Sequence, residues 1–543
     1  MSDMALEKIS WSVDSLVYRK GTFFGFGWAF HKDADINRLQ LAVRLKDGGY
    51  ELLDAEIHKP REDLASHFPQ FPQAHHAGFL ILGSIQGQIH EQNPFALHCS
   101  LDDGRSLSLN LPAQNVTMLA DDGNQKQLMR RQFSLMLKRA WFLFKNGRLA
   151  ELKNKAVRQV RAVQDEMPPD TLLQQLADYA EFPVTLLIDH DLGGGANHYR
   201  ERLVNEKLNA GNPVVILSFR VSSLELMLIL RCPGKKEIRY AMHSYEHAKA
   251  ILSGLQIGEL IYNTGVSFST PEAIPGLLFE LKSKNDARLV MLVHDFFTVC
   301  PSHFLLDQNG QFCGVPGGSD CERCLKKNHS TFASLYRDRN VAEWRRLWGA
   351  VYDSADEIVV FSNSSLQLLK RSYPRLDSQK VFIRPHDVSY IRSAPLMPAP
   401  NACLKIGVVG QIGYHKGARF LQELTEEINK RHSQIKIAII GEMLFPCDKT
   451  VVSQTGKYDH EQLPELIKQS GANVMLFPSI CPETFSYVVH ELIAFSLPIA
   501  CFNLGAPAER LAEYPHGHVL ESQNPARVLD ELIEFHRYLY LQN

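Results

Sequence analysis

Two glutamates, Glu483 and Glu491, stand eight residues apart in the stretch Pro482–Glu491, whose sequence is PETFSYVVHE. If the chain between them were mostly helical, the two carboxylates would lie ~12 Å apart, at ~1.5 Å of rise per residue. At that separation they cannot share one proton or one metal ion, but they can hold the two ends of a long ligand. The N–H groups of a helix start between them would suit a phosphate. The pattern predicts a nucleotide-sugar site; the alternative is a helix-capping glutamate and an unrelated surface glutamate.

A glycine-containing turn with a lysine precedes this stretch. The apolar run Leu404–Val409 leads into the sequence GQIGYHKG, which contains Gly410, Gly413 and Lys416. Such a turn at the start of a helix can hold a diphosphate through backbone N–H groups and one ammonium group. The alternative is that Lys416 is an ordinary solvated lysine.

A second turn consists of Gly193, Gly194 and Gly195, directly after the apolar run Val184–Asp189. A continuous apolar run predicts a buried parallel strand. Glycines at its end let the backbone approach a ligand at the start of the next helix. The turn does not match the GxGxxG fingerprint of dinucleotide-binding proteins, so by itself it is weak evidence.

The apolar run Arg288–Val293 ends in His294 and Asp295. Ligands of open α/β sheets lie at the carboxyl ends of the strands, so His294 is a candidate site residue. The alternative is a histidine that is hydrogen-bonded inside the core.

Four cysteines, Cys300, Cys313, Cys321 and Cys324, follow in a loop rich in glycine and proline. Two thiolates two residues apart, with two more brought round by the loop, can form a tetrahedral zinc site. Four thiolates would leave no open position, which favours a structural over a catalytic zinc. The alternative is four unrelated thiols.

Composition narrows the class of protein. The chain has 543 residues, 45% of them hydrophobic and 22% charged, with a net charge of −2. These values are typical of a soluble globular protein of several domains, and the balanced charge gives no reason to expect nucleic acid as a partner. We find no transmembrane run or signal peptide and expect a cytoplasmic protein with reduced cysteines.

The chain divides into four predicted parts. Short apolar runs between Gly, Asp and Pro predict a β-sandwich accessory domain at residues 1–119, whose aromatics form either its core or a sugar-binding platform. Residues 120–181 are a predicted basic helical linker, and residues 182–400 and 401–543 are two α/β units with Rossmann-like strand–turn–helix patterns. In the first unit we expect strands at Val184–Asp189, Val214–Phe219, Glu259–Asn263 and Arg288–Val293.

The linker carries an unusual charge pattern. Between residues 125 and 164 eleven Lys/Arg residues stand against one acidic residue, Glu151, with aromatics between them. A basic helix with an aromatic stripe is typical of peripheral membrane contact. The alternative is a helix that packs its apolar side on a neighbouring domain.

Two α/β units with glycine turns and a late Glu483-x7-Glu491 resemble the GT-B glycosyltransferases, most closely the retaining enzymes of family 4. The resemblance covers residues 183–543 and includes Pro385-His386-Asp387. The cysteine-rich loop, residues 300–324, is similar to one in bacterial cell-surface polysaccharide enzymes of this type.

The resemblance implies roles for individual residues. Glu483 would contact the donor sugar, His294 would lie near the transferred sugar, and Lys416 would bind the leaving diphosphate; these are the predicted catalytic residues. The predicted donor-binding residues are Gly410, Gly413, Lys416, Phe485, Ser486, Tyr487, Glu491, Gly193, Gly194 and Gly195. No metal cofactor is needed for catalysis, because the lysine and a helix dipole can neutralise the leaving group. Gln411 stands where the family often has an arginine, so Arg384 or Arg419 would supply a second cation.

The expected function is transfer of a sugar, with retention of configuration, from a nucleotide-diphosphate sugar to a glycan or lipid-linked glycan, as in the synthesis of cell-surface polysaccharides such as lipopolysaccharide. One alternative is a GT-B nucleotide-sugar 2-epimerase, which needs no acceptor. The other is a non-catalytic carbohydrate-binding protein with a degenerate transferase half.

Overall fold

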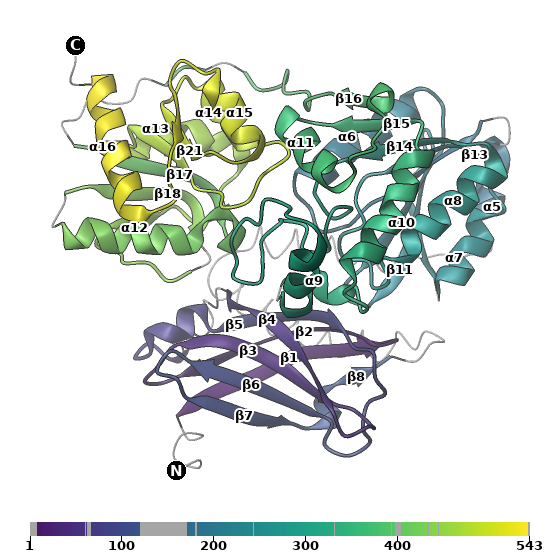
Figure 1. The fold of residues 1–543 in the computed structure, drawn as a ribbon, viewed down its shortest axis with the longest axis horizontal. Coiled ribbons are helices and arrows are strands. Elements are labelled where there is room, and N and C mark those ends of the chain that lie inside the picture. The colour runs from purple at the N-terminus through teal and green to yellow at the C-terminus, as the bar shows by residue number, and fades with distance from the viewer. Residues whose placement is uncertain are drawn as a thin grey trace. The chain divides into compact units, whose positions relative to one another are not determined.

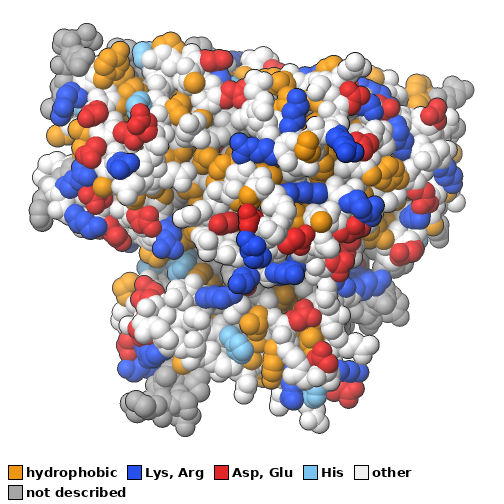
Figure 2. Space-filling view, viewed as in Figure 1, with side chains coloured by type: hydrophobic (Ala, Val, Ile, Leu, Met, Phe, Trp, Pro, Cys, Tyr) orange, Lys and Arg blue, Asp and Glu red, His pale blue; other side chains and the backbone are white. Residues whose placement is uncertain are grey.

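The structure is a computed structural model. It describes residues 8–119 (except 60, 62, 63, 65 and 66), 171–179, 182–396 (except 243, 329, 331 and 393) and 403–540 (except 432, 433 and 444). The predicted basic helix of residues 125–164 lies outside the described residues. The chain forms two compact units: the first comprises Met1–Leu292, Phe297–His303 and Glu322–Ile358, and the second Val293–Phe296, Phe304–Cys321 and Val359–Asn543. Basic and acidic side chains are interspersed on the face shown in Figure 2, as the small net charge implies.

The N-terminal part of the first unit is all-β, as expected. Its strands are β1 (Ile9–Arg19), β2 (Thr22–His31), β3 (Ile36–Arg44), β4 (Tyr50–Lys59), β5 (Gly78–Ser84), β6 (Phe95–Leu101), β7 (Ser106–Leu111) and β8 (Thr117–Met118). They form one hydrogen-bonded sheet in the order β7-β6-β3-β4-β5-β2-β1-β8, rather than two separate sheets. One hydrophobic core takes side chains from both halves of this order, among them Phe23 and Phe79 from one half and Leu41 and Phe95 from the other.

The aromatic residues of β2 alternate in exposure because successive side chains of a strand point to opposite faces. Phe23 is buried in the core, whereas Phe24, Phe26 and Trp28 are half-buried on the other face. Phe30 is buried in a small satellite cluster with Leu64. Most of these aromatics thus contribute to packing, and whether the half-buried ones bind sugar stays a prediction.

The second sheet has the order β12-β11-β10-β9-β13-β14-β15-β16. Its strands are β9 (Val184–Ile188), β10 (Val214–Arg220), β11 (Glu225–Arg231), β12 (Ile238–Met242), β13 (Ile257–Tyr262), β14 (Arg288–Leu292), β15 (Glu357–Val360) and β16 (Val381–Ile383). The helices of this region are α5 (Thr171–Leu176), α6 (Gly195–Asn209), α7 (Tyr245–Leu252), α8 (Ala273–Asn285), α9 (Gly318–Lys327), α10 (Val341–Ser354) and α11 (Asn363–Ser372). Strands β9, β10, β13 and β14 pair in parallel. All four strands expected here are present.

The antiparallel strands β11 and β12, which extend this sheet beyond β10, were not predicted from the sequence. The start of β11 connects this sheet with the N-terminal sheet of the first unit: Arg19 of β1 forms an ion pair with Glu225 of β11 at 3.0 Å, and both side chains are about 5% exposed or less. Two charged residues that pair across the fold add nothing to a periodic apolar pattern. Neither Arg19 nor Glu225 could therefore be recognised as a paired residue from the sequence.

The third sheet lies in the second unit and has the order β19-β18-β17-β20-β21-β22. Its strands are β17 (Lys405–Ile412), β18 (Lys436–Met443), β19 (Val452–Gln454), β20 (Val474–Phe477), β21 (Ile499–Phe502) and β22 (Gly517–Leu520), all parallel. Its helices are α12 (Ala418–Lys430), α13 (Leu463–Ser470), α14 (Tyr487–Ala494), α15 (Gly505–Ala512) and α16 (Pro525–Tyr540).

Two separate hydrophobic cores cover the two faces of this sheet. Buried residues of α12 and α16 pack on one face, and those of α13, α14 and α15 pack on the other (Figure 1). The third sheet is therefore covered by helices on both faces in the Rossmann manner. The predicted architecture, two α/β sheets of the GT-B type preceded by an all-β region, is confirmed.

Candidate functional site

The third sheet has its topological switch point between β17 and β20. The chain passes from β17 to β18 and β19 on one side, and β20, β21 and β22 follow on the other. In open α/β sheets the crevice for a ligand lies at the carboxyl ends of the strands on either side of such a point. The lysine turn, which we define as residues 410–417, begins in the last three residues of β17 and continues beyond its end, and Glu483 lies six residues after the end of β20.

The lysine turn is shaped by Gly417. Residues Tyr414–Lys416 form one turn of 3-10 helix, and Gly417 then adopts a left-handed conformation with a φ of +85° before α12 begins. A Cβ atom at Gly417 would lie 2.1 Å from the carbonyl oxygen of Pro478. Glycine is thus required both for the backbone angle and for the close approach of the segment after β20.

The segment after β20 is also hydrogen-bonded to the lysine turn. The carbonyl oxygen of His415 accepts hydrogen bonds from the Ile480 N–H at 3.0 Å and from the Ser479 hydroxyl at 3.4 Å. The half-buried Lys416 therefore lies between two strand ends that are tied to each other. Arg419, a candidate second cation, instead pairs with Glu423 on the exposed side of α12.

Glu483 lies beside this lysine and is half-buried. Burial raises the pKa of its carboxyl group, and the charge of Lys416 and a hydrogen bond from Ser479 only partly offset that effect. Its Oε1 atom is buried and accepts no hydrogen bond from the residues that the structure describes. Because a buried carboxylate oxygen without a donor is costly, this atom is a ready acceptor for a ligand hydroxyl.

The backbone around Glu483 is held on both sides. Its carbonyl oxygen accepts a hydrogen bond from the Ala506 N–H at 2.8 Å, at the start of α15. A Cβ atom at Gly505 would come within 2.6 Å of the Glu483 backbone. The Thr484 hydroxyl donates to the carbonyl oxygen of His294 at 2.8 Å, so His294, nearly two hundred residues earlier in the chain, lies next to this motif. Its predicted place near the transferred sugar stays a prediction.

The helix of the PETFSYVVHE stretch is shorter than expected. It begins at Tyr487, after the N-cap Ser486, whose side chain accepts a hydrogen bond from the Val489 N–H. The four residues from Glu483 to Ser486 are not helical, so the ~12 Å separation expected for a mostly helical segment does not apply. The amino end of α14 nevertheless follows Glu483 directly, and its dipole favours an anion there.

Glu491 lies on α14 with a side chain that is 7% exposed, and its Oε1 atom is hydrogen-bonded to Nε2 of His460 at 2.7 Å. The His460 ring is 65% exposed and comes from the loop before α13. A carboxylate offers about four lone-pair directions, so Glu491 can accept from a ligand as well as from His460. The sequence analysis missed His460, because a lone histidine in a polar loop carries no pattern.

Aromatic rings and histidines pack around the start of this helix. The His386 ring stacks on Phe485 with centroids 4.3 Å apart, and its Nδ1 atom is 2.8 Å from the hydroxyl of Tyr487. The His294 ring lies 4.4 Å from Phe361 and 5.1 Å from His386. These contacts fix the side chains of Phe485 and Tyr487, two of the predicted donor-binding residues.

A carboxylate connects α11 with α15 in the same unit. Glu509 accepts hydrogen bonds from the Asn363 amide side chain at 2.8 Å and from the Ser364 N–H at 2.8 Å. Although burial alone would raise it, the pKa of Glu509 is lowered by these hydrogen bonds. The end of β15, which precedes α11, is thereby attached to the unit that carries Glu483.

The glycine turn, Gly193–Gly195, lies at the corresponding switch point of the second sheet, between β9 and β13. Gly193 and Gly194 have φ values of +86° and +89°, and a Cβ atom at either would meet nothing within 4 Å in the described residues. The turn is open, and glycine is needed there for its backbone angles rather than for space. It belongs to the first unit.

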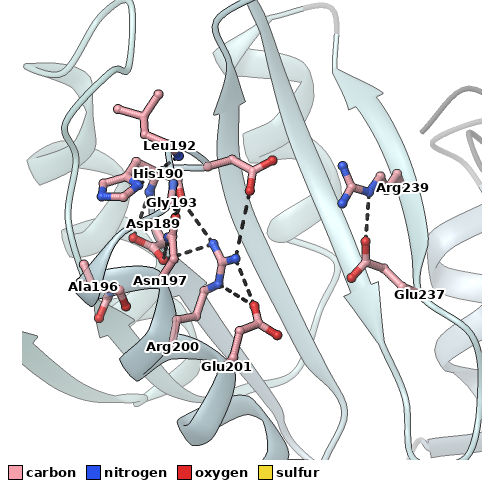
Figure 3. Close-up of polar contacts among 12 residues, drawn as sticks. Asp189, His190, Leu192, Gly193, Ala196, Asn197, Arg200, Glu201, Glu237 and Arg239 are labelled. Atoms are coloured by element: carbon pink, nitrogen blue, oxygen red, sulfur yellow. Dashed lines mark hydrogen bonds and ion pairs between the residues drawn. The ribbon is translucent and has the colours of Figure 1, made fainter. Parts of the chain in front are cut away.

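A buried polar network holds this glycine turn (Figure 3). Asn197 accepts the Gly193 N–H at 2.6 Å and donates to Asp189 at 2.8 Å, and Arg200 donates to Asp189 at 3.0 Å. Burial raises the pKa of Asp189, and the charges of His190 and Arg200 oppose that rise. The sequence singled out the glycines but not Asp189, Asn197 and Arg200, because polar residues at a strand end resemble ordinary capping residues.

The cysteines are arranged differently from the predicted zinc site. All ten are free thiols. Within the described part of the chain, no group of three or more Cys, His, Asp or Glu side chains lies where it could hold a metal ion. The Cys313 and Cys321 sulfurs instead accept the backbone N–H groups of Val315 and Gly317. The zinc site is therefore not formed by this arrangement of side chains, and metal binding stays a prediction.

Residues 400–537 match the sequence profile of a family described as "Glycosyl transferases group 1". This part of the chain is a group 1 glycosyltransferase domain. The chain is thus a nucleotide-sugar-dependent glycosyltransferase, and both the family resemblance and the predicted enzyme class, a retaining glycosyltransferase, are confirmed. No curated protein matches the sequence significantly.

Solved glycosyltransferases are similar to this one in fold. HepE of Anabaena, solved with UDP and glucose, is 13% identical over 65% of this chain and 90% of its own, with a TM-score of 0.40. A Rickettsia africae glycosyltransferase is 11% identical over 65% and 88%, with a TM-score of 0.41. TarM of S. aureus, solved with Fondaparinux, alpha-GlcNAc-glycerol and UDP, is 14% identical over 59% and 57%, with a TM-score of 0.36.

Proposed function

We propose that this glycosyltransferase moves a sugar from a nucleotide-diphosphate donor to a glycan or lipid-linked glycan acceptor in the synthesis of a cell-surface polysaccharide. The observation that carries the donor side is Glu483, whose buried Oε1 atom is available as an acceptor, next to Lys416 and the amino end of α14. The end of this strand offers a hydrogen-bond acceptor that suits a sugar hydroxyl. The cation and the helix dipole beside it suit the diphosphate to which the sugar is bonded.

In this proposal each residue has one role. Lys416 and the N–H groups at the start of α14 bind the diphosphate and stabilise the charge that develops on it as the sugar leaves. Glu483 accepts hydrogen bonds from the sugar hydroxyls, and Glu491 accepts them from the ribose. His294 lies beside the transferred sugar. Catalysis then consists mainly of positioning and leaving-group stabilisation, without a metal ion.

Two variants test the transfer of the sugar from the donor. Lys416→Ala should lower the transfer rate on the order of 10²–10³-fold, because a charged contact with the developing anion is lost. Glu483→Gln preserves the shape of the side chain and should abolish most transfer while the melting temperature changes little. Lys430→Ala, a solvated lysine of α12 that is 69% exposed, is the matched control.

The assay follows release of nucleoside diphosphate from a panel of nucleotide sugars, with UDP-glucose as the first probe, with and without a glycan acceptor. Release that requires the acceptor supports transfer, whereas interconversion of two nucleotide sugars without an acceptor would indicate an epimerase. If Lys416→Ala and Glu483→Gln both transferred at the wild-type rate, the proposed donor site would be wrong.

We also propose peripheral membrane contact through residues 125–164, on the basis of their eleven basic residues and the aromatics between them. Across the described residues no helix has the length and apolarity to span a bilayer. Flotation with anionic vesicles should carry the wild type upward and leave behind a variant in which Arg130, Arg131, Lys138 and Arg139 are replaced by glutamine. If the wild type does not float, this proposal is wrong.

Structural zinc remains a separate proposal based on the spacing of Cys300, Cys313, Cys321 and Cys324. A loop of this kind would fold around the ion, so its thiolates need not already be arranged as a site when the ion is absent. Metal analysis of the purified protein should give about one equivalent of zinc. A value far below one equivalent would refute it.

A further inference from the structure

Residues 304–314, the first half of the cysteine-rich loop, form a small hairpin within the second unit. Leu306 and Phe312 pair across it as an antiparallel bridge. The Asp307 N–H donates to the carbonyl oxygen of Gln311 at 2.7 Å, and the Cys313 N–H donates to that of Leu305 at 3.0 Å. The segment is thus an ordered two-stranded element rather than an open loop.

The tip of the hairpin is held by one carboxylate. Asp307 accepts hydrogen bonds from the backbone N–H groups of Asn309 at 2.8 Å and of Gln311 at 3.0 Å. At its base, the Arg371 side chain from α11 donates to the carbonyl oxygen of Gly314 at 2.6 Å. The N–H groups of the turn are bound within the hairpin, and its base is hydrogen-bonded to a helix. The hairpin can therefore hold a neighbouring segment in place.

This hairpin contacts the lysine turn at two points. The Phe304 ring stacks on the His415 ring with centroids 4.1 Å apart and an angle of 9° between the planes. The Tyr414 hydroxyl donates to the carbonyl oxygen of Gly310 at 3.3 Å. A Cβ atom at Gly310 would lie 2.1 Å from that hydroxyl oxygen, so only glycine, with its φ of +75°, allows the approach.

Burial raises the pKa of Tyr414, so its hydroxyl stays protonated and able to donate at neutral pH. On the opposite side, Ser479 and Ile480 bond to the carbonyl oxygen of His415. Tyr414 and His415 are therefore clamped between the hairpin and the segment after β20. The next residue along the chain is Lys416.

We propose that the hairpin of residues 304–314 is a positioning element of the donor site. It holds Tyr414 and His415, and through them places the ammonium group of Lys416 against the donor diphosphate. The proposal rests on the proposed function, because it deepens the role given there to Lys416. Phe304, Gly310 and Tyr414 are positioning residues, since none of them needs to touch the donor.

The first experiment measures the support itself and needs no donor. Hydrogen–deuterium exchange is followed in the peptide that covers residues 413–417, where the Lys416 N–H bonds to Gly413 and the Gly417 N–H bonds to Tyr414. Phe304→Ala should speed exchange of this peptide on the order of 2–12-fold, the factor that corresponds to one stacked aromatic pair. Unchanged exchange would overturn the proposal.

The second experiment measures nucleotide affinity by calorimetry with UDP, GDP and ADP as probes. The nucleotide that the wild type binds should bind Phe304→Ala and Tyr414→Phe several-fold more weakly, and kcat/KM should fall with them. Phe304→Tyr, which keeps the ring, should restore both values. Tyr538→Ala, which removes a ring of α16 that is 67% exposed, is the control and should change neither.

The outcomes separate this proposal from the proposed function. If the wild type binds a nucleotide and Tyr414→Phe and Phe304→Ala bind it equally well, the hairpin has no positioning role and the proposal fails alone. If the wild type binds none of the nucleotides or nucleotide sugars, the proposed function fails, and the role of the hairpin at a donor site fails with it. Tyr414→Phe removes a single hydroxyl group, so it remains informative even if Phe304→Ala does not fold.

Discussion

Replacing Gly417 by alanine tests whether the lysine turn must lie in close contact with the segment after β20. The new Cβ atom would lie 2.1 Å from the carbonyl oxygen of Pro478, well inside van der Waals contact. The left-handed backbone angle adds about 1–2 kcal/mol of strain for a residue with a side chain. The clash cannot be relieved by a side-chain rotation, because both atoms belong to or adjoin the backbone. The lysine turn and the segment that leads to Glu483 would therefore have to separate.

We expect Gly417→Ala to lower kcat/KM by about 10²-fold, the loss that a displacement of about 1 Å can cause in a preorganised site. The matched control is Gly471→Ala. Gly471 is also left-handed, with a φ of +65°, but a Cβ atom there would meet nothing closer than 3.8 Å. Both variants should lose similar stability through backbone strain, and only Gly417→Ala should also lose activity.

The assay compares steady-state transfer and the denaturation midpoint of both variants with the wild type, at a temperature where all three are folded. If Gly417→Ala transferred as fast as Gly471→Ala, the close contact between residue 417 and Pro478 would be irrelevant to the site. If both lost activity equally, backbone strain alone would explain the effect. Either result would refute the reasoning from close approach.

Further predictions concern the buried polar groups. Glu225→Ala should destabilise the protein by about 3–5 kcal/mol, because it removes the carboxylate from the buried ion pair with Arg19. A hydrogen bond from Ser223 and the charge of Arg220 lower the folded pKa of Glu225 despite its burial, so the stabilisation by this carboxylate should be complete above the unfolded pKa of about 4.3 and disappear as pH falls through the folded value, as followed by urea denaturation. His460→Ala should weaken nucleotide binding several-fold, as measured by calorimetry. Tighter binding would mean that His460 competes with the nucleotide for the Glu491 carboxylate. Asn197→Ala should speed hydrogen exchange at the glycine turn, and an unchanged rate would show that the network does not hold it.

The architecture was largely predictable because it is carried by apolar runs. The β9, β10, β13 and β14 strands are mostly apolar segments, and their boundaries fall within a few residues of those expected. The antiparallel β11 was missed, although its sequence ELMLILR is apolar, because the sequence alone does not show that a strand pairs back on its neighbour. Pairing direction depends on the turn and on contacts far along the chain.

The positions of the candidate site residues were predictable where short sequence motifs contain them, and their roles stay predictions. Glu483, Glu491 and Lys416 all lie at the carboxyl edge of one sheet or on the helix that follows it. What the sequence could not show were the partners that long-range folding supplies, such as His460 at Glu491 and Phe304 at His415. The mistaken separation of the two glutamates has a local cause, since Pro482 and the N-cap Ser486 delay the helix until Tyr487.

The attachment of α11 to α15 through Glu509 has a consequence for exchanging donor specificity between enzymes. A recombination point at residue 400, where the family match begins, would transfer the third sheet without Asn363, Ser364 or the hairpin of residues 304–314. In the chimaera, Glu509 and Tyr414 would then lack their hydrogen-bond partners from this enzyme, which are Asn363 and Ser364 for Glu509 and Gly310 for Tyr414. A chimaera that keeps these contacts would have to move three separate segments of the chain together rather than one contiguous domain.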